Sequence, residues 1–177
     1  MGACVCHIGG GGRQRICHDR FDDCAGASAQ RRGAQKNGPQ AIGRSKGGLT
    51  TKIHATCDAL GNPTGFFLTP GQAHDLAGAD ALLPRIKADT ILADKAYDAD
   101  ERVLEPLAAA GKRAVIPPKS NRKIQRTYDR ELYKLRHLIE NFFLKLKQYR
   151  AIATRYDKTD QNFLAAIHAA ATIILLN

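Results

Sequence analysis

The sequence lacks any apolar run long enough to cross a bilayer. The longest such stretch, NFLAAIHAAATIILL, contains His168 and has 15 residues, whereas a membrane-spanning helix needs about 20. A secretion signal is not predicted either, because a glycine run at residues 9–12 stands where such a signal has its apolar core. These absences argue against a membrane protein and predict a cytoplasmic one.

Paired cysteine motifs of the zinc-binding type are lacking too. Cys4 and Cys6 form C-x-C rather than C-x2-C, and no second matched pair follows. Without export, the five cysteines, including Cys57 in an expected strand, are predicted to be reduced thiols. The alternative is a zinc-dependent regulator, since thiolate and imidazole are ligands that zinc prefers. Its ligands would come from the early residues Cys4, Cys6, His7, Cys17, His18 and Cys24.

Acidic residues are few, and the excess of positive charge is concentrated in one region. The net charge of the chain is +10, and residues 119–158 hold 12 Lys or Arg against 4 Asp or Glu, which leaves +8 there. A one-sided basic region of this size predicts binding to a nucleic-acid backbone, with an affinity that falls as salt rises. The alternative is a solvated charged surface.

The pattern from residue 41 onward predicts an α/β domain. A length of 177 residues and a hydrophobic content of 44% fit one domain with its own core. Strands at 49–58 and 64–69, joined by Gly61, Asn62 and Pro63, predict a hairpin. The other expected elements are a helix at 74–87, a strand at 90–93, a helix at 98–110, a strand at 113–118, a basic loop at 119–127, a long helix around Glu140 and an apolar terminal helix.

One polar pattern lies in the expected long helix. It reads Y-x2-R-x3-E-x6-K and comprises Tyr133, Arg136, Glu140 and Lys147. On a 3.6-residue period the first three side chains share one stripe, and Lys147 returns to it two turns later. A carboxylate between cations suggests phosphate chemistry. The alternative is a solvated basic helix with pairs between oppositely charged neighbours.

A second pattern, DTILADKAYDAD, lies upstream. Ile91, Leu92 and Ala93 predict a buried strand, and Asp94 follows at its carboxyl end, where open α/β sheets present functional groups. The alternative is that Asp94 only caps a following helix, since aspartate is a favoured cap residue. Asp98 and Asp100 are better placed to be that cap, which favours a functional role for Asp94.

Together the two patterns resemble the motifs of insertion-sequence DDE transposases of the IS-four and IS-five type. The resemblance covers residues 41–177 and implies a ribonuclease-H-like mixed sheet flanked by helices. It implies that Asp94 and Glu140 are catalytic and bind Mg²⁺ or Mn²⁺. It further implies double-stranded DNA, both transposon ends and target, as the partner, and a homo-oligomer on that DNA. The DNA-binding residues would be Tyr133, Arg136, Lys145, Lys147 and Arg150.

The implied reaction needs a third carboxylate. Cleavage by water and transfer of the freed 3′-OH use a pair of hard cations bridged by oxygen ligands. In the family the first aspartate lies in a segment like I-D-S-T-I-V-R-A-H-Q, ahead of residue 41. No such segment is present in this chain.

The segment that stands in its place predicts a shift of reading frame. Codons that encode residues 17–34 give Val-Met-Ile-Asp-Ser-Thr-Ile-Val-Arg-Ala-His-Gln when they are read one nucleotide later. We therefore expect residues 1–40 to be an irregular, out-of-frame segment, which leaves the first strand of the sheet missing or replaced, and residues 41–177 to be a partial catalytic domain. The chain alone is expected to be inactive, and production as a fusion with an upstream frame would supply the aspartate. The alternative is a non-catalytic, basic DNA-binding remnant.

Overall fold

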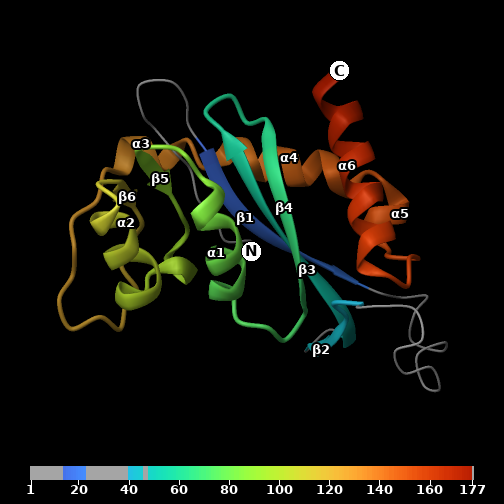
Figure 1. Cartoon of the computed structure of the whole chain (residues 1–177), viewed down its shortest axis with the longest axis horizontal. Coiled ribbons are helices and arrows are strands. Elements are labelled where there is room, and N and C mark those ends of the chain that lie inside the picture. Colours follow the sequence, from blue (N-terminus) through green and yellow to red (C-terminus); the bar gives the residue numbers. More distant parts are fainter. Residues whose placement is uncertain (1–13, 23–39, 46–47, 177) are drawn as a thin grey trace.

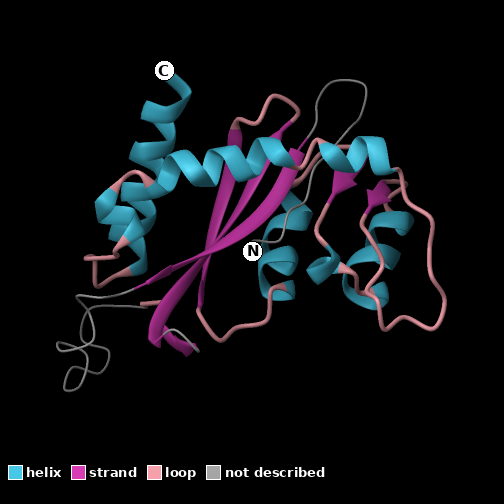
Figure 2. Cartoon of the chain, turned by 180° about the vertical axis from the view of Figure 1, so that it is seen from behind, coloured by secondary structure: helices cyan, strands magenta, loops and turns pink. Residues whose placement is uncertain are grey.

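The computed structural model describes residues 14–22, 40–45 and 48–176, and of residues 14–22 the backbone alone. These residues build a six-stranded mixed sheet with helices on both faces (Figures 1 and 2). The main strand order is β2-β3-β1-β5-β6, and β4 pairs with β3. The strands are β1 (Gln14–Asp22), β2 (Gly43–Ser45), β3 (Gly48–Asp58), β4 (Pro63–Pro70), β5 (Thr90–Leu92) and β6 (Arg113–Val115).

The expected hairpin is present as β3 and β4, which pair in antiparallel register from Thr51–Pro70 to Cys57–Pro63. Its turn is organised by Asp58, whose Oδ1 accepts the backbone N–H groups of Leu60 at 2.8 Å and Asn62 at 2.9 Å. Gly61 has a φ of 94°, a left-handed conformation that a side chain would strain. The turn residues therefore set the register of the hairpin.

Strand β1 corrects, for residues 14–22, the expectation that residues 1–40 are irregular, and it occupies the place in the sheet where the first strand was expected to be missing or replaced. It runs antiparallel to β3 over nine residue pairs and parallel to β5 at Gln14–Ile91 and Arg15–Leu92. Backbone groups form these pairs, and every non-proline residue supplies them, so a segment with few apolar residues can still become a strand. The other residues of the expected irregular segment up to 39 lie outside the described part, including Cys4, Cys6 and Cys24.

Helical segments and strands alternate after the hairpin, as expected, but the helices are shorter. Residues 74–87 contain α1 (Leu76–Leu82) and the 3₁₀ turn η2 (Leu83–Arg85). Residues 95–110 contain the 3₁₀ turn η3 (Lys95–Tyr97), the π-helical turn η4 (Asp100–Leu104) and α2 (Glu105–Ala109). Pro84 and Pro106 each stand at the start of a new segment. Proline has no N–H to continue the preceding helix, which accounts for both changes.

The sheet separates two apolar cores. On one face α4 (His137–Lys147), α5 (Arg150–Ala153) and α6 (Asp160–Leu176) cover β3 and β4, with Ile53, Phe142 and Phe163 among the buried residues. On the other face, α1 and the segments up to α2 pack around Ile91 and Tyr97. Figure 2 shows α4 lying across the sheet. Because both faces are covered, residues 50–57 of β3 are all buried.

The terminal apolar helix packs on this core, as expected. α6 buries Phe163, Ile167, Ala170 and Ala171, whereas its last turn exposes Leu175 and Leu176 and projects from the body of the protein in Figure 1. Among the described residues no helix has the length and apolar character needed to cross a membrane.

Candidate functional site

Asp94 lies just beyond the carboxyl end of β5, as the sequence predicted. Its Oδ1 accepts the backbone N–H of Lys95 at 2.6 Å, so the side chain does cap the short turn η3. Its Oδ2 lies 3.7 Å from a guanidinium nitrogen of Arg136. The cap therefore uses one oxygen only, and the other faces α4.

Arg136 joins the two predicted carboxylates. It is the residue before α4, and its guanidinium also ion-pairs with Glu140 one turn into that helix. The side chains of Asp94 and Arg136 are 17% and 24% exposed, and that of Glu140 is 44% exposed. Two acids that are far apart in sequence, one behind β5 and one on α4, thus meet at a single cation in a half-open site. The catalytic role of the acids stays a prediction.

The four-residue polar pattern does not lie on one continuous helix, which corrects the expectation. α3 (Arg130–Lys134) carries Tyr133, and α4 begins at His137. The ring Nδ1 of His137 lies 2.9 Å from the carbonyl oxygen of Lys134, and the amide of Arg136 bonds to the carbonyl of Tyr133 instead of continuing the α-helical pattern. A side chain bonded to a backbone carbonyl within the turn is a recognised cause of a helix break.

Tyr133 still lies beside the site, although it belongs to another helix. The Arg136 guanidinium carbon lies 5.7 Å from the centre of the Tyr133 ring, a cation–π distance. The Tyr133 ring meets that of Tyr128 edge-on at 5.5 Å, and both pack against the buried pair Leu92 and Val115. The Tyr128 ring therefore supports the Tyr133 ring, which contacts Arg136.

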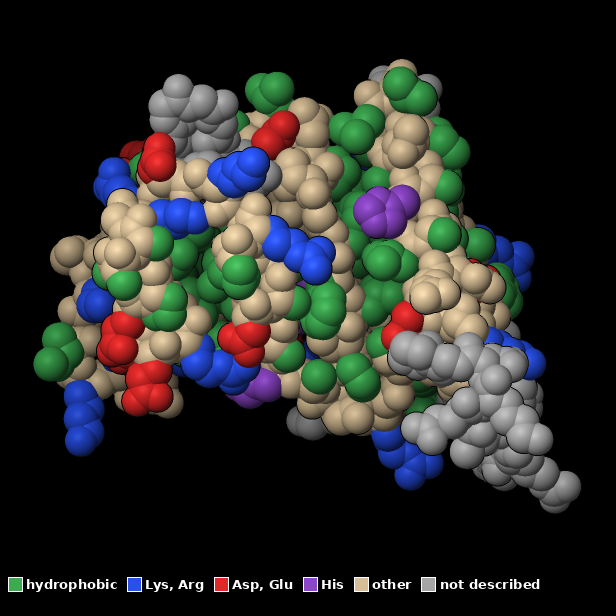
Figure 3. All heavy atoms as spheres, in the orientation of Figure 1, with side chains coloured by type: hydrophobic (Ala, Val, Ile, Leu, Met, Phe, Trp, Pro, Cys, Tyr) green, Lys and Arg blue, Asp and Glu red, His purple; other side chains and the backbone are tan. Residues whose placement is uncertain are grey.

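The remaining predicted DNA contacts lie farther along the helical face. Lys145 and Lys147 are exposed on α4, and Arg150 is exposed on α5. On the face seen in Figure 3 the basic side chains are scattered among acidic and uncharged ones, whereas α4 lies on the opposite side of the sheet. Lys147 follows Glu140 by two turns on the same helix, as the pattern predicted.

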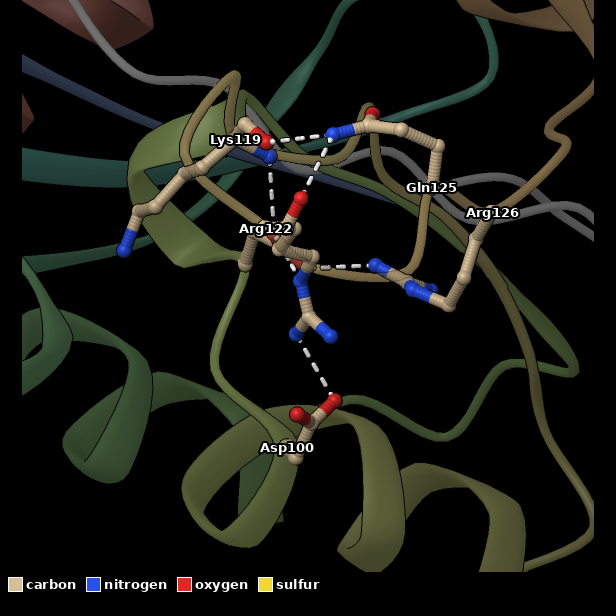
Figure 4. A network of polar contacts seen from close by, with 6 residues as sticks. Asp100, Lys119, Arg122, Gln125 and Arg126 are labelled. Carbon is tan, nitrogen blue, oxygen red and sulfur yellow. Dashed lines mark hydrogen bonds and ion pairs between the residues drawn. The ribbon is translucent and has the colours of Figure 1, made fainter.

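Sequence reasoning missed a cluster of charged groups centred on Asp98. Its side chain is fully buried and accepts the backbone N–H of Lys119 at 2.8 Å and the Nε of Arg122 at 2.5 Å, and it also pairs with Arg126. Arg122 reaches on to Asp100 at 2.7 Å (Figure 4). We call these five residues the Asp98 cluster. Asp98 and Asp100 were expected to cap a helix, but η4 has no side-chain cap.

The charges in the cluster reinforce one another. Burial alone would raise the pKa of the Asp98 carboxyl, but the hydrogen bonds from Arg122 and Lys119 and the charges of Arg126 and Arg122 outweigh it and lower that pKa. The hydrogen bond from Arg122 likewise lowers the pKa of Asp100, and both acids raise the pKa of Arg122. Asp98, Asp100 and Arg122 are therefore ionised at neutral pH. Its signal in the sequence was the pairing of acids at 98 and 100 with arginines at 122 and 126.

The donor set partly fits a hard divalent cation. Asp94 and Glu140 supply carboxylate oxygens, which Mg²⁺ and Mn²⁺ prefer. Within the described side chains, no group of three or more His, Cys, Asp or Glu could hold a metal ion. Asp94 and Glu140, two of the three expected ligands, thus lie against the same guanidinium, that of Arg136. The side chains of β1, the strand next to β5, lie outside the described part.

Comparison with known proteins identifies the family. A family model described as a transposase DDE domain matches residues 12–175, a region that includes β1. The chain is 43% identical over 131 residues to "Putative transposase for insertion sequence element IS6501" of Brucella ovis, an alignment that covers 72% of this chain and 99% of that protein. No solved structure matches the chain. The chain belongs to the DDE-domain transposases of insertion sequences.

Proposed function

We propose that the chain forms the catalytic part of a DNA transposase that cleaves DNA strands with divalent metal and joins the freed 3′-OH to target DNA. The observation that carries the proposal is the meeting of Asp94 and Glu140 at the Arg136 guanidinium beside the end of β5. Two carboxylates that lie against one cation can supply oxygen ligands to a divalent metal that also binds phosphate.

The sheet supports a ribonuclease-H-like fold. Strand β1 lies between the antiparallel strand β3 and the parallel strand β5, and β6 continues the parallel part. This arrangement puts the chain segment after β5 next to the central strand. A carboxylate on the central strand, one after β5 and one on α4 could therefore share one site, which is the arrangement that the resemblance implied.

Asp94 and Glu140 are the residues that would hold the metal. A bound divalent metal would activate water, and later the 3′-OH, and would stabilise charge on the phosphate. Asp94 is oriented for this by its hydrogen bond to the Lys95 amide. Arg136 balances part of the negative charge of the two acids in the free protein, and it would contact a phosphate oxygen once DNA is bound. Tyr133 holds Arg136 in place, and Lys147 provides a further phosphate contact along α4.

Activity of this chain depends on the first strand. Asp19 and Asp22 are the carboxylates in β1, but the I-D-S-T-I segment of the family does not occur there. We propose that the chain as given cleaves little DNA because the first aspartate is missing. The alternative, a basic DNA-binding remnant, is favoured by the concentration of positive charge in residues 119–158, which binding to DNA alone would use.

Nicking of supercoiled plasmid in Mg²⁺ or Mn²⁺ tests the proposal. The chain as given is compared with one in which residues 17–24 are replaced by Val-Met-Ile-Asp-Ser-Thr-Ile-Val. The matched control carries the same replacement with Asn in place of its Asp. We expect nicking only with the Asp version, and we expect Asp94→Asn or Glu140→Gln to return it to background.

Each outcome distinguishes a different hypothesis. Nicking that persists after Asp94→Asn and Glu140→Gln would refute the assigned catalytic residues. Strong nicking by the chain as given, abolished by Asp19→Asn, would show that β1 already supplies the third carboxylate. DNA binding in EDTA without nicking by any version would favour the non-catalytic remnant.

A further inference from the structure

The Asp98 cluster ties a basic loop to the segment that follows Asp94. The basic loop, residues 119–127, lies between β6 and α3 and contains no helix or strand. One buried carboxylate bonds to it at its start, through the Lys119 amide, and again through Arg122 and Arg126. Gln125 closes the loop on itself, because its Nε2 donates to the carbonyl oxygens of Lys119 at 3.2 Å and Arg122 at 3.3 Å.

The loop cations are thereby divided into two kinds. Arg122 and Arg126 have their charge balanced by Asp98 and Asp100. Lys119 and Lys123 have no such balance, because among the described residues the ion pairs of this loop involve Arg122 and Arg126 alone. The Lys123 side chain is exposed. Figure 4 shows the Lys119 side chain directed away from the cluster. The two arginines therefore serve the loop's structure, and the two lysines are available to a ligand.

The position of the loop relates these lysines to the candidate site. The basic loop follows β6, which runs parallel to β5. The loop therefore starts at the same end of the strands as Asp94. It leads through Tyr128 into α3, where Tyr133 contacts Arg136. Asp98 itself follows Asp94 by four residues, with only η3 between them. The loop and the candidate site are thus built on the same short segment.

We propose that the basic loop is a preorganised contact for the DNA backbone, with Lys119 and Lys123 as the phosphate-binding cations and Asp98 as the positioning residue. This inference rests on the proposed function, because it takes DNA as the substrate. It extends that function by adding a second set of contacts to the duplex, separate from those of Lys145, Lys147 and Arg150 on the helical face.

Asp98 can favour the binding of anionic DNA, although it is acidic, because it fixes the conformation of the basic loop in advance. A flexible nine-residue loop would lose conformational freedom when DNA ordered it, and this cost lowers affinity. A loop already fixed by the buried Asp98 avoids most of that loss. The net charge and the loop geometry therefore make opposite predictions for Asp98→Asn. That substitution makes the chain more positive by one unit, so charge alone predicts tighter DNA binding, whereas loss of the anchored geometry predicts weaker binding.

Duplex binding measured in EDTA at several salt concentrations tests the proposal apart from cleavage. Lys119→Gln with Lys123→Gln should reduce the slope of log affinity against log salt by about 1.8, since each lost phosphate contact accounts for about 0.9. The matched control is Arg85→Gln with Lys87→Gln, two exposed cations that precede β5 at its opposite end. It removes the same charge and should change the slope by much less.

Asp98→Asn should weaken binding and reduce the slope in the same direction as the lysine pair. Its control, Asp80→Asn, removes an exposed acid paired with Arg102 and should leave binding equal or slightly tighter. The triple variant that combines Asp98→Asn with the two lysine substitutions should lose little more affinity or slope than the lysine pair or Asp98→Asn alone. Tighter binding by Asp98→Asn would overturn the positioning role. If Asp98→Asn does not fold, the double lysine variant decides: an unchanged slope of log affinity against log salt for that variant overturns the proposal. DNA binding by the wild-type chain would in that case leave the proposed function intact.

Discussion

Removing the Asp98 carboxylate should destabilise the fold far more than removing an exposed acid. Asp98→Ala leaves the Lys119 amide and the Arg126 guanidinium without their acceptor and leaves Arg122 with Asp100 alone. The side chains of Arg122 and Arg126 are only 20% and 33% exposed. Breaking one side of a buried ion pair costs about 3–5 kcal/mol. Because water can reach these arginines in part, we expect about 3 kcal/mol. For a domain of this size that corresponds to a fall in melting temperature of about 6–12 °C.

Thermal unfolding followed by circular dichroism measures this effect, and Asp80→Ala is the matched control. Asp80 and its partner Arg102 are both nearly half exposed. A surface pair of this kind contributes less than about 1 kcal/mol. A loss below about 1 kcal/mol for Asp98→Ala would show that the Asp98 cluster does not hold the loop in solution.

The stability contribution of Asp98 should also depend on pH in a predictable direction. The pKa of Asp98 is lower in the folded protein than in the unfolded chain, because the arginine contacts outweigh burial. Its contribution is therefore complete above the unfolded pKa of about 4 and is lost as the pH falls through the folded pKa. The stability difference between wild type and Asp98→Ala should thus be constant from pH 7 to pH 5 and should shrink below about pH 4. A difference that grows on acidification would contradict this account.

Two further predictions concern the core and the helical face. A Cβ added to Gly78 would lie 2.1 Å from Nδ1 of the buried His54, whose Nε2 lies 2.8 Å from the Thr69 hydroxyl. The clash should cost about 1–3 kcal/mol of stability, which exceeds the gain of about 1 kcal/mol from the higher helix propensity of alanine. Gly78→Ala should therefore lower the urea concentration at the unfolding midpoint. A higher midpoint would refute the packing of Gly78 against His54. On the helical face, Lys145→Gln, Lys147→Gln and Arg150→Gln should each reduce the slope of log duplex affinity against log salt by up to about 0.9. Fluorescence anisotropy measures this affinity. Unchanged slopes would show that these side chains are only solvated and do not contact DNA.

Local patterns sufficed where local interactions determine the structure. The hairpin of β3 and β4 was predictable because Gly61 and the Asp58 side chain act within the turn itself. The buried strand β5 was predictable because both of its faces are covered, which leaves an unbroken apolar run. The same reasoning placed Asp94 at the end of that strand. In each case the deciding residues lie within a few positions of one another.

Other features depend on partners far away in the sequence. The ion pair of Arg136 with Asp94 joins the start of α4 to the end of β5, and a single-helix pattern gives no sign of that contact. Strand β1 has little apolar content, yet it fills the place between β3 and β5, whose backbone groups would otherwise face an open edge. Its formation was therefore not visible in its own residues.

Asp94 and Asp98 show how one short motif can hold two acids with opposite roles. Both occur in ADKAYD, and both were considered as helix caps. Asp94 is partly exposed and shares a single guanidinium with Glu140, so its charge remains available to a bound cation. Asp98 is fully buried and meets three donors from the basic loop, so its charge is already satisfied. The metal-binding hypothesis therefore applies to Asp94 and not to Asp98, and substitution of Asp98 should impair DNA binding even when no metal is present.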